Sequence, residues 1–309
     1  MEIKPKVYVA IVVAMLFWSF SFIWFKMANE DYLPITIIFM RLSLSVVLLT
    51  LYLGLNGTLF KNRIKKEDRR YFFMLGFFEP FLYFLGESFG LTYVSSTAAS
   101  VLIATIPVFA TIGAWLLFKE RLGKLNYAGI VLSFVGVLIF IINRDGTLSF
   151  SMKGILLMML AVFSAVGYNL TLRHLAGTYS PVYIVNVQNI IGLVLFTPLF
   201  LIFDLREFTT LTHTLESMMP VILLAIFASC GAFILFAYSV RHLGLTRSNV
   251  FSNSIPVFTA FFSYLLLKEV LTLQNMIGMI IVIAGLFLSQ INGNRKKYTE
   301  AEILTGKTA

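Results

Sequence analysis

Cysteine, histidine and charged residues are all scarce in this sequence, and each shortage narrows the range of functions. The single cysteine, Cys230, excludes an intrachain disulfide and any metal site built from several cysteines. The three histidines, His174, His213 and His242, lie far apart and do not indicate a metal cluster. The motifs His-Glu-x-x-His and Gly-x-x-x-x-Gly-Lys-Ser/Thr are both missing, so neither a zinc protease nor an ATP-hydrolysing enzyme is indicated.

Charged residues make up only 13% of the chain, whereas 59% of the residues are hydrophobic. This balance excludes a disordered chain and is not typical of a soluble globular domain. The hydrophobic residues form long runs, unlike the alternating segments of about ten residues that build a membrane β-barrel. We therefore predict an all-α polytopic membrane protein, because about 20 apolar residues in a helix cross the ~30 Å hydrocarbon core.

Ten membrane spans can be drawn along the sequence. They cover residues 7–27, 34–55, 71–92, 95–118, 125–142, 153–172, 181–203, 218–240, 246–267 and 271–290. The first run is long and lacks a small-residue cleavage pattern, so we predict no cleavable signal peptide.

Lysine and arginine are unevenly shared between the two sides of the predicted membrane. With the N-terminus inside, 18 of the 24 Lys and Arg residues fall on the inner side, 5 fall on the outer side, and Arg41 lies within a span. The positive-inside rule then predicts that both termini and the basic loop 56–70 are cytoplasmic. The formal net charge of +9 is concentrated in these loops and in the tail, which favours anionic lipid over nucleic acid as a partner.

The chain repeats itself at an offset of 149 residues. The segment Ile-Pro-Val-Phe at 106–109 recurs at 255–258, Lys119-Glu120 recurs as Lys268-Glu269, Gly129 as Gly278, and Gly136 as Gly285. We interpret the two Lys-Glu pairs, which lie at span ends, as interfacial caps. Each unit holds an odd number of spans, so the second unit would enter the membrane from the opposite side, as in the inverted repeats of secondary transporters. We predict a first repeat at 1–145, a second at 152–290 and a cytoplasmic basic tail at 291–309, although a duplicated scaffold or enzyme would show the same repeat.

Two carboxylates, Glu79 and Glu87, lie inside the third predicted span. Ionisable groups at that depth are costly, and they usually face a protein interior or a wet cavity where they serve a function. Pro80 cannot donate a backbone hydrogen bond, so we predict a kink beside Glu79. Tyr83 lies one helical turn from each acid and could bridge them. The alternative is tight helix packing through Gly86-x-x-x-Gly90, with both acids merely hydrogen-bonded inside.

Other polar and aromatic side chains are candidates for a binding site within the membrane. We expect the polar side chains of spans six and nine to contact a polar ligand, and two aromatic side chains of span one to form a cavity wall. These candidates are Tyr168, Asn169, Asn249 and Asn253, with Trp18 and Phe22. The amides of span seven, in contrast, are expected to pair across helices, as such groups commonly do.

Three further residues in the spans suggest structural or mechanical roles. Pro107 and Pro256 occupy matching positions in the two repeats, and each interrupts a helix, which favours either a hinge or a static kink. Arg41 could clamp an anion, but we expect a structural ion pair with an internal acid.

The chain resembles the drug/metabolite transporter superfamily, in its EamA-like ten-span branch. The resemblance covers about Val7 to Gln290. It is carried by Trp18, Phe22 and Lys26, by Arg41, and by the paired stretches that run from Thr97 through Ile-Pro-Val-Phe and Lys-Glu to Gly129 and Gly136. It implies an inner-membrane exporter of a metabolite or an amino acid, with a central cavity between the halves. Glu79 and Glu87 are not part of the family pattern.

We therefore expect an inner-membrane secondary transporter, not an enzyme, that exports a small metabolite or amino-acid-like solute by alternating access. Its partners would be the substrate, the lipid bilayer and, through Glu79 or Glu87, protons. We predict no cofactor, metal or nucleic acid, and a monomer or homodimer. The sequence is also compatible with two alternatives: an intramembrane enzyme that uses Glu79 and Glu87 as an acid pair, and a non-transporting assembly or sensor protein.

Overall fold

The structure is a computed structural model that describes residues 5–58, 64–110, 112, 123–142 and 150–290. Helices dominate this part of the chain, and it contains no β-strand. The elements are α1 (Pro5–Ala28), α2 (Pro34–Leu55), η1 (Lys66–Asp68), α3 (Arg69–Gly76), η2 (Phe77–Leu82), α4 (Tyr83–Leu91), α5 (Ser96–Ile103), α7 (Lys124–Ile141), α8 (Met152–Ala176), α9 (Pro181–Leu199), η3 (Phe200–Asp204), α10 (Leu205–Phe208), α11 (Leu215–Leu223), η4 (Leu224–Ala232), α12 (Phe233–Leu243), α13 (Leu245–Phe251), η5 (Ser252–Ser254), α14 (Ile255–Leu267) and α15 (Leu273–Gln290). The prediction of an all-helical membrane protein is confirmed.

Seven helices of the described chain are long and apolar enough to cross a membrane, by length and composition. They are Pro5–Ala28, Pro34–Leu55, Lys124–Ile141, Met152–Ala176, Pro181–Phe208, Leu215–Leu243 and Arg247–Leu267. The other three predicted spans do not meet this criterion as continuous helices. The span 71–92 is interrupted, Ser96–Ala110 and Leu273–Ser289 are shorter apolar helices, and most of 111–118 lies outside the described residues.

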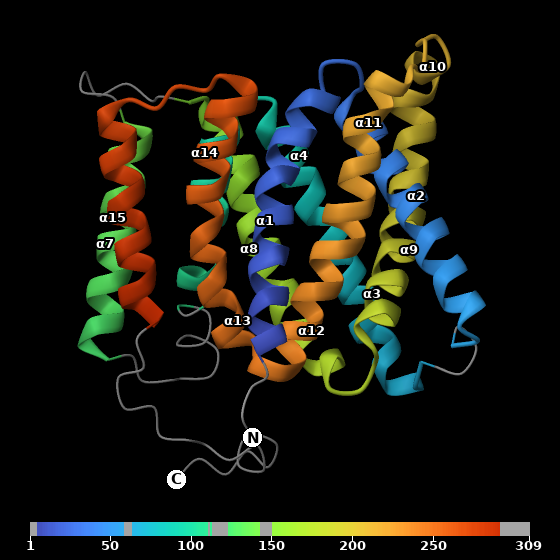
Figure 1. Ribbon diagram of the computed structural model, residues 1–309, viewed down its shortest axis with the longest axis horizontal. Helices are drawn as coiled ribbons and strands as arrows, with labels where there is room; N and C mark the ends of the chain where they lie inside the picture. The colour runs from blue at the N-terminus through green and yellow to red at the C-terminus, as the bar shows by residue number, and fades with distance from the viewer. Residues whose placement is uncertain (1–4, 59–63, 111, 113–122, 143–149, 291–309) are drawn as a thin grey trace.

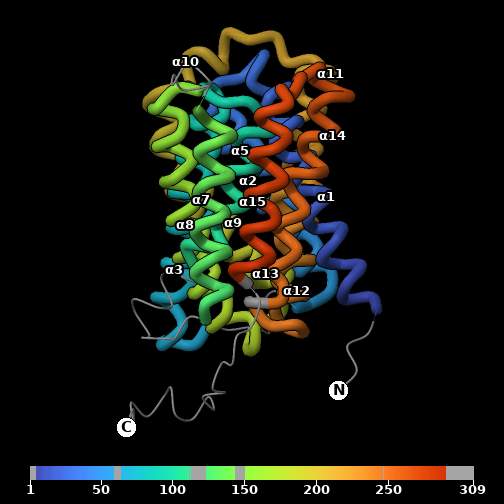
Figure 2. The backbone as a smooth tube through the Cα atoms, turned by 90° about the vertical axis from the view of Figure 1, so that its left-hand side faces the viewer, coloured from blue at the N-terminus to red at the C-terminus, as the bar shows by residue number. Residues whose placement is uncertain are grey.

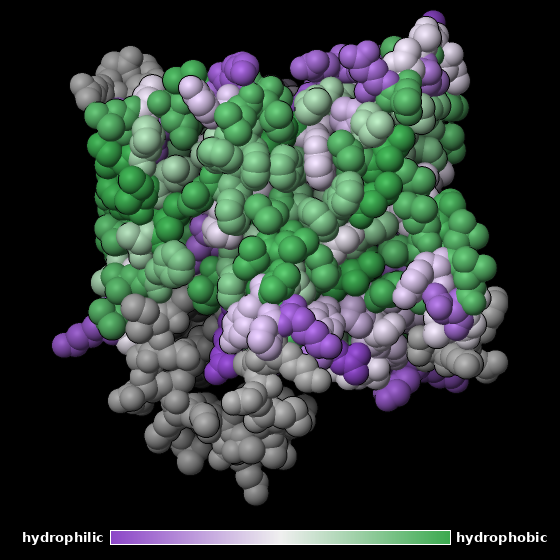
Figure 3. All heavy atoms as spheres, in the orientation of Figure 1, coloured by the Kyte–Doolittle hydropathy of each residue, from purple (hydrophilic) through white to green (hydrophobic). Residues whose placement is uncertain are grey.

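The helices run side by side as a bundle, with short connections at its two ends (Figures 1 and 2). Helix α1 begins and α15 ends at the same end of the bundle, the lower end in Figure 1. On the face drawn in Figure 3, hydrophobic residues cover the middle of the bundle, and hydrophilic residues gather at its upper and lower ends. This distribution is the one expected of helices that span a bilayer.

Helices α7 and α15 form a pair at one side of the bundle (Figure 1), and four glycines hold their backbones close together. A Cβ atom added at Gly129 would lie 2.7 Å from the carbonyl oxygen of Gly285, and one at Gly285 would lie 2.8 Å from that of Gly129. Likewise, a Cβ atom at Gly136 would lie 2.9 Å from the carbonyl oxygen of Gly278, and one at Gly278 would lie 3.0 Å from that of Gly136. Small residues favour such contacts in membranes, where close van der Waals packing drives helix association.

Helix α4 packs on α8 through Gly86 and Gly90, as the Gly-x-x-x-Gly spacing predicts. A Cβ atom at Gly86 would meet the backbone of α8, 2.5 Å from the Leu157 oxygen and 2.7 Å from the Ala161 nitrogen. At Gly90 the nearest atom would be the Met158 sulfur, at 2.6 Å. The packing interpretation of these glycines is therefore confirmed, and it holds alongside any function of the acids on the same helix.

Both repeated prolines lie where a helix is interrupted. Before Pro107, helix α5 ends and a turn at Ala104 and Thr105 separates it from the helical residues that follow. Before Pro256, the single 3₁₀ turn η5 separates α13 from α14. The predicted breaks are thus confirmed, whereas their movement as hinges stays a prediction.

Candidate functional site

A cavity lies inside the bundle, where α1, α2, the interrupted third span, α5, α8, α12 and the break between α13 and α14 meet. Its lining residues are Trp18, Ser21, Phe22, Arg41, Glu79, Tyr83, Phe84, Glu87, Ile103, Ile106, Ala165, Tyr168, Asn169, Phe233, Phe236, Asn249, Ser252 and Ile255. The centres of water-sized molecules can occupy about 60 Å³ of it. One water needs roughly 10–15 Å³ on this measure, so the cavity has room for several waters or one small solute.

The interruption of the third span places Glu79 in the cavity. Glu79 has extended backbone angles (φ −143°, ψ 117°) between the helical segments on either side, next to Pro80. The predicted kink is therefore confirmed, although the span is broken into α3, η2 and α4 instead of merely bent. Ser164 on α8 donates a hydrogen bond of 2.5 Å to the carbonyl oxygen of Phe78, which supplies a partner to the backbone at the break.

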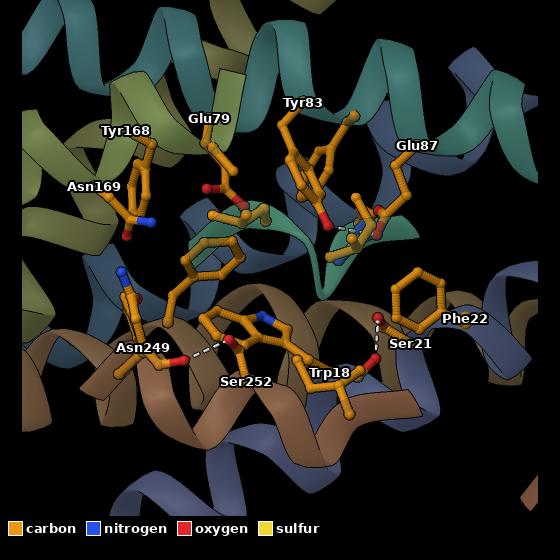
Figure 4. A pocket seen from close by; sticks show the side chains of 18 residues that line it. Trp18, Ser21, Phe22, Glu79, Tyr83, Glu87, Tyr168, Asn169, Asn249 and Ser252 are labelled. Atoms are coloured by element: carbon orange, nitrogen blue, oxygen red, sulfur yellow. Dashed lines mark hydrogen bonds between the residues drawn. The ribbon is translucent and has the colours of Figure 1, made fainter. Parts of the chain in front are cut away.

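The side chain of Glu79 points into the cavity, between Tyr168 on one side and Tyr83 on the other (Figure 4). The residue is only 6% exposed. Among the described residues, its carboxylate accepts no hydrogen bond and forms no ion pair within 4.0 Å. Buried polar groups usually have a partner, so an unpartnered carboxylate that faces a cavity is a candidate ligand-binding group.

Glu87 lies at the other end of the cavity and is already partnered. The hydroxyl of Tyr83 donates a hydrogen bond of 2.9 Å to Glu87 Oε1. Tyr83 therefore contacts one of the two acids and does not bridge them, because the extended backbone at Glu79 ends the regular helical spacing that would align all three residues.

Arg41 does not form the predicted structural ion pair. No carboxylate of the described chain lies within 4.0 Å of its guanidinium. Instead its Nε donates a hydrogen bond of 2.8 Å to Ser229 Oγ, and its guanidinium carbon lies 4.2 Å from the centroid of the Phe84 ring. A hydroxyl and an aromatic face thus take the place of a direct contact with an acid.

Aromatic rings form one wall of the cavity, opposite Glu79 (Figure 4). The ring of Trp18 lies 5.3 Å from that of Phe233 and 5.0 Å from that of Phe236, measured between centroids. Tyr168 makes an edge contact with Phe233 at 6.0 Å. Trp18 and Phe22 line the cavity as expected. The sequence offered no signal for Phe233 and Phe236, because they are two of 31 phenylalanines in a chain whose lipid-facing surface is also aromatic.

The amides of spans six and nine divide between the cavity and the packed interior. Asn169 and Asn249 line the cavity. Asn253 is 1% exposed and does not line the cavity. Its neighbour Ser252 lines the cavity instead, and the Ser252 hydroxyl donates a hydrogen bond to the carbonyl oxygen of Asn249. Regular helical spacing would place Asn249 and Asn253 on one face. The 3₁₀ turn at 252–254 advances about 120° per residue instead of 100°, so the two side chains no longer share that face.

Two amides of span seven pair across helices, as predicted. Asn186 accepts a hydrogen bond from Thr50, and Asn189 donates to Ser45 at 2.7 Å. Gln188 behaves differently: it is fully buried, and neither polar atom of its side chain has a hydrogen-bond partner in the described chain.

Carboxylates connect distant parts of the chain at the upper end of the bundle in Figure 1. Asp204 accepts hydrogen bonds of 2.9 Å from both the backbone nitrogen and the hydroxyl of Thr36, at the start of α2. Glu269 accepts from the backbone nitrogens of Ser96 and Thr97, at the start of α5. Acidic groups are favourable at helix N-termini. The cap interpretation of Lys268-Glu269 is confirmed for Glu269, while Lys119-Glu120 lies outside the described residues.

A matching contact closes the lower end. Tyr179 donates a hydrogen bond of 2.7 Å to one oxygen of Asp68, and Nε2 of His174 lies 3.1 Å from the other. These interactions lower the pKa of Asp68 below its usual value, and the hydrogen bond from Tyr179 has the largest effect. Asp68 is covered by its neighbours but lies at the rim of the bundle, so desolvation opposes them only in part.

A short motif in α4 bears on the enzyme alternative. Residues 86–90, Gly-Glu-Ser-Phe-Gly, match Gly-x-Ser-x-Gly, the pattern around the nucleophile of many hydrolases. That chemistry requires a sharp strand-to-helix turn with the serine at its exposed tip. Here the pattern lies within a continuous helix, and Ser88 is fully buried on it. The motif therefore does not form a nucleophile elbow.

An all-helical bundle with apolar sides, and with a central cavity that combines aromatic walls and a few polar groups, is the general form of a membrane transporter. The sequence model of the EamA-like transporter family matches this chain twice, at residues 5–142 and 152–290. The chain therefore belongs to the EamA-like transporter family, and the resemblance inferred from its sequence is confirmed.

Similar proteins cover most of this chain. An uncharacterized transporter of Archaeoglobus fulgidus is 26% identical over 92% of this chain and 98% of its own length. The uncharacterized transporter YcxC of Bacillus subtilis is 25% identical over 95% of both chains. A protein of known crystal structure shares the fold, with a TM-score of 0.68 at 13% identity over 93% of this chain and 98% of its own.

Proposed function

We propose that this membrane transporter is a secondary transporter of the cell inner membrane, which exports a small metabolite or amino-acid-like solute by alternating access. In this proposal ten spans form two inverted halves at 1–145 and 152–290, with both termini and the tail 291–309 in the cytoplasm. The central support is the cavity, because both halves contribute helices and interrupted backbone to its lining. Binding sites at such interruptions are common in secondary transporters.

The packing of α7 on α15 supports the inverted repeat. The 149-residue offset exchanges Gly129 with Gly278 and Gly136 with Gly285. Under this exchange the contact between Gly129 and Gly285 becomes the contact between Gly278 and Gly136, and both contacts exist. A two-fold axis that relates the halves would produce this reciprocal pattern.

Contacts at the two ends of the bundle support alternating access. Asp204 and Glu269 of the second half hold helix starts of the first half at one end, and Asp68 of the first half holds Tyr179 of the second at the other. Each contact consists of a few hydrogen bonds to a carboxylate, which is a small enough interaction to break and remake as a gate opens.

Glu79 and Glu87 are the proposed coupling groups, since each could carry a proton across as the cavity changes sides. The test uses protein reconstituted in liposomes with an internal pH-sensitive dye, and a panel of metabolites is added outside. Glu79→Gln and Glu87→Gln retain the shape of the side chain and remove its charge. At least one of them should abolish solute-driven proton movement, while Glu216→Gln, an exposed acid at the start of α11, should behave as wild type.

The outcomes separate the alternatives. Native flux with unchanged pH dependence in both variants would refute proton coupling and leave a facilitator. Conversion of a metabolite without any flux would instead favour the intramembrane enzyme. Binding without either flux or conversion would favour a sensor.

A further inference from the structure

The charges that line the cavity do not balance. Two carboxylates, Glu79 and Glu87, face one guanidinium, Arg41. Glu87 accepts the hydrogen bond from the hydroxyl of Tyr83, whereas Glu79 has no partner in the described chain. One guanidinium can balance only one of the two carboxylates, so one negative charge in the cavity remains without a counterpart. A buried charge is stable only when it is paired or neutralised.

The surroundings of Glu79 are those of a site for a positive charge. Its carboxylate points into the cavity without a partner in the described chain (Figure 4). The hydroxyl of Tyr168, which is 2% exposed, also lacks a hydrogen bond there, although Gln188 lies close by outside hydrogen-bond geometry. The oxygen of Tyr168 is enclosed by protein atoms, so the carboxylate of Glu79 is the acceptor that an N–H donor in the cavity would satisfy.

The opposite wall offers the second component of cation recognition. The rings of Trp18, Phe233 and Phe236 form a connected cluster, in which the Trp18 centroid lies 5.3 Å from that of Phe233 and 5.0 Å from that of Phe236. Aromatic faces attract organic ammonium groups, and the attraction grows when the site is desolvated. A neutral solute lacks the electrostatic part of this attraction, and the excess negative charge repels an anion.

We propose that the substrate of this transporter is a small monovalent organic cation, an amine or a quaternary ammonium, whose nitrogen lies between Glu79 and the ring cluster. This inference rests on the proposed transport function and deepens it by naming the substrate class. A zwitterion such as an amino acid would leave the excess negative charge, whereas a monocation cancels it. The cavity has room for several waters, which corresponds to a solute of few heavy atoms.

Calorimetric titration of the full-length wild-type protein in detergent tests the inference with four probes of similar size. They are n-butylamine, tetramethylammonium, 1-butanol and alanine. Both cations should bind, and 1-butanol and alanine should bind at least tenfold more weakly. Equal binding of 1-butanol, or tighter binding of alanine than of n-butylamine, would overturn the cation site. This panel needs no variant and so does not depend on whether a variant folds.

Variants then assign the binding to residues. Glu79→Gln should lower the affinity for both cations at least tenfold, and Glu79→Asp should retain part of it. Glu216→Gln is the matched control on an exposed acid. Unchanged cation affinity in folded Glu79→Gln protein would refute the role of Glu79.

Flux measurements keep this inference distinct from the transport proposal. Tetramethylammonium is permanently charged and crosses a bare bilayer slowly, so its radiolabelled form reports carrier-mediated flux in proteoliposomes. Binding of tetramethylammonium without flux would overturn the transport function and leave the cation site intact. Flux of alanine without cation binding would overturn the cation site and leave the transport function intact.

Discussion

The contact of Gly86 with α8 leads to a prediction in which one added methyl group both destabilises the protein and disturbs its cavity. In Gly86→Ala, the new Cβ atom would lie 2.5 Å from the carbonyl oxygen of Leu157 and 2.7 Å from the nitrogen of Ala161. Ordinary contact begins at about 3.4 Å, so α4 and α8 must separate by nearly 1 Å. Both obstructing atoms belong to the backbone and cannot rotate away.

The size of the effect follows from two opposing contributions. Overpacking of this kind costs about 1–3 kcal/mol, and the contact with two backbone atoms places this site near the upper value. Alanine recovers about 1 kcal/mol through its higher helix propensity. We therefore expect Gly86→Ala to lower the free energy of unfolding by about 2 kcal/mol.

Gly54 is the matched control, since it lies in α2 and a Cβ atom there would meet nothing within 4 Å. Gly54→Ala should be neutral or stabilise the protein by up to about 1 kcal/mol. Denaturant titration of both purified variants in mixed micelles measures the difference. Equal stability of the two variants would refute the packing argument. Since Glu87 follows Gly86 directly, Gly86→Ala should also weaken ligand binding, which Gly54→Ala should not.

Two further predictions concern movement and orientation. Pro107→Ala and Pro256→Ala should slow transport more than they weaken equilibrium ligand binding if these breaks act as hinges; normal flux in both variants would mean that the breaks are static. A reporter that is active only outside the cell should stay silent when fused after Gln290, and activity there would contradict the ten-span topology.

The sequence predicted the fold better than the site because the two depend on different information. Apolar runs report the helices directly, since a helix satisfies its own backbone in lipid. The break beside Glu79 was also predictable, because Pro80 removes a backbone donor whatever surrounds it. Arg41 and Ser229 are 188 residues apart, and their contact depends on which helices become neighbours. No local pattern contains that information.

The position of Asn253 shows a second limit. Its four-residue spacing from Asn249 places both residues on one face only if the helix is regular. Pro256 signals an interruption, but not whether the chain adopts a 3₁₀ turn, a kink or an extended residue there. The corresponding proline-linked interruptions near Pro80 and Pro107 take two other forms, so the face that each residue presents had to come from the structure.

The last prediction concerns the contact at the lower end of the bundle, where Asp68 accepts a hydrogen bond from Tyr179 and lies beside His174. Asp68 is in η1, outside the membrane-spanning helices, and Lys65 adds a favourable charge. The hydrogen bond from Tyr179 is the largest cause of the lowered pKa of Asp68. Because the folded protein holds the carboxylate more strongly in its ionised form, the contact stabilises the fold whenever Asp68 is ionised.

The sign of the pH dependence follows. The stabilisation is fully present above the ordinary aspartate pKa of about 3.9, and it is lost as the pH falls through the lower pKa of the folded state. Asp68→Asn should cost about 1 kcal/mol at pH 7, a value that solvent screening at the rim keeps small. The difference between wild type and this variant should shrink towards zero as the pH falls below about 4.

Glu67→Gln supplies the control, because Glu67 is the exposed neighbour of Asp68 in the same turn. Unfolding free energies of the three proteins between pH 7 and pH 3 measure the effect, and a difference for Asp68→Asn that stays constant over this range would contradict it. If the contact also acts as a gate, its loss favours the state in which this end is open. Asp68→Asn should then change the rate of transport at pH 7 while Glu67→Gln does not, because only the former removes a bond that the opening must break.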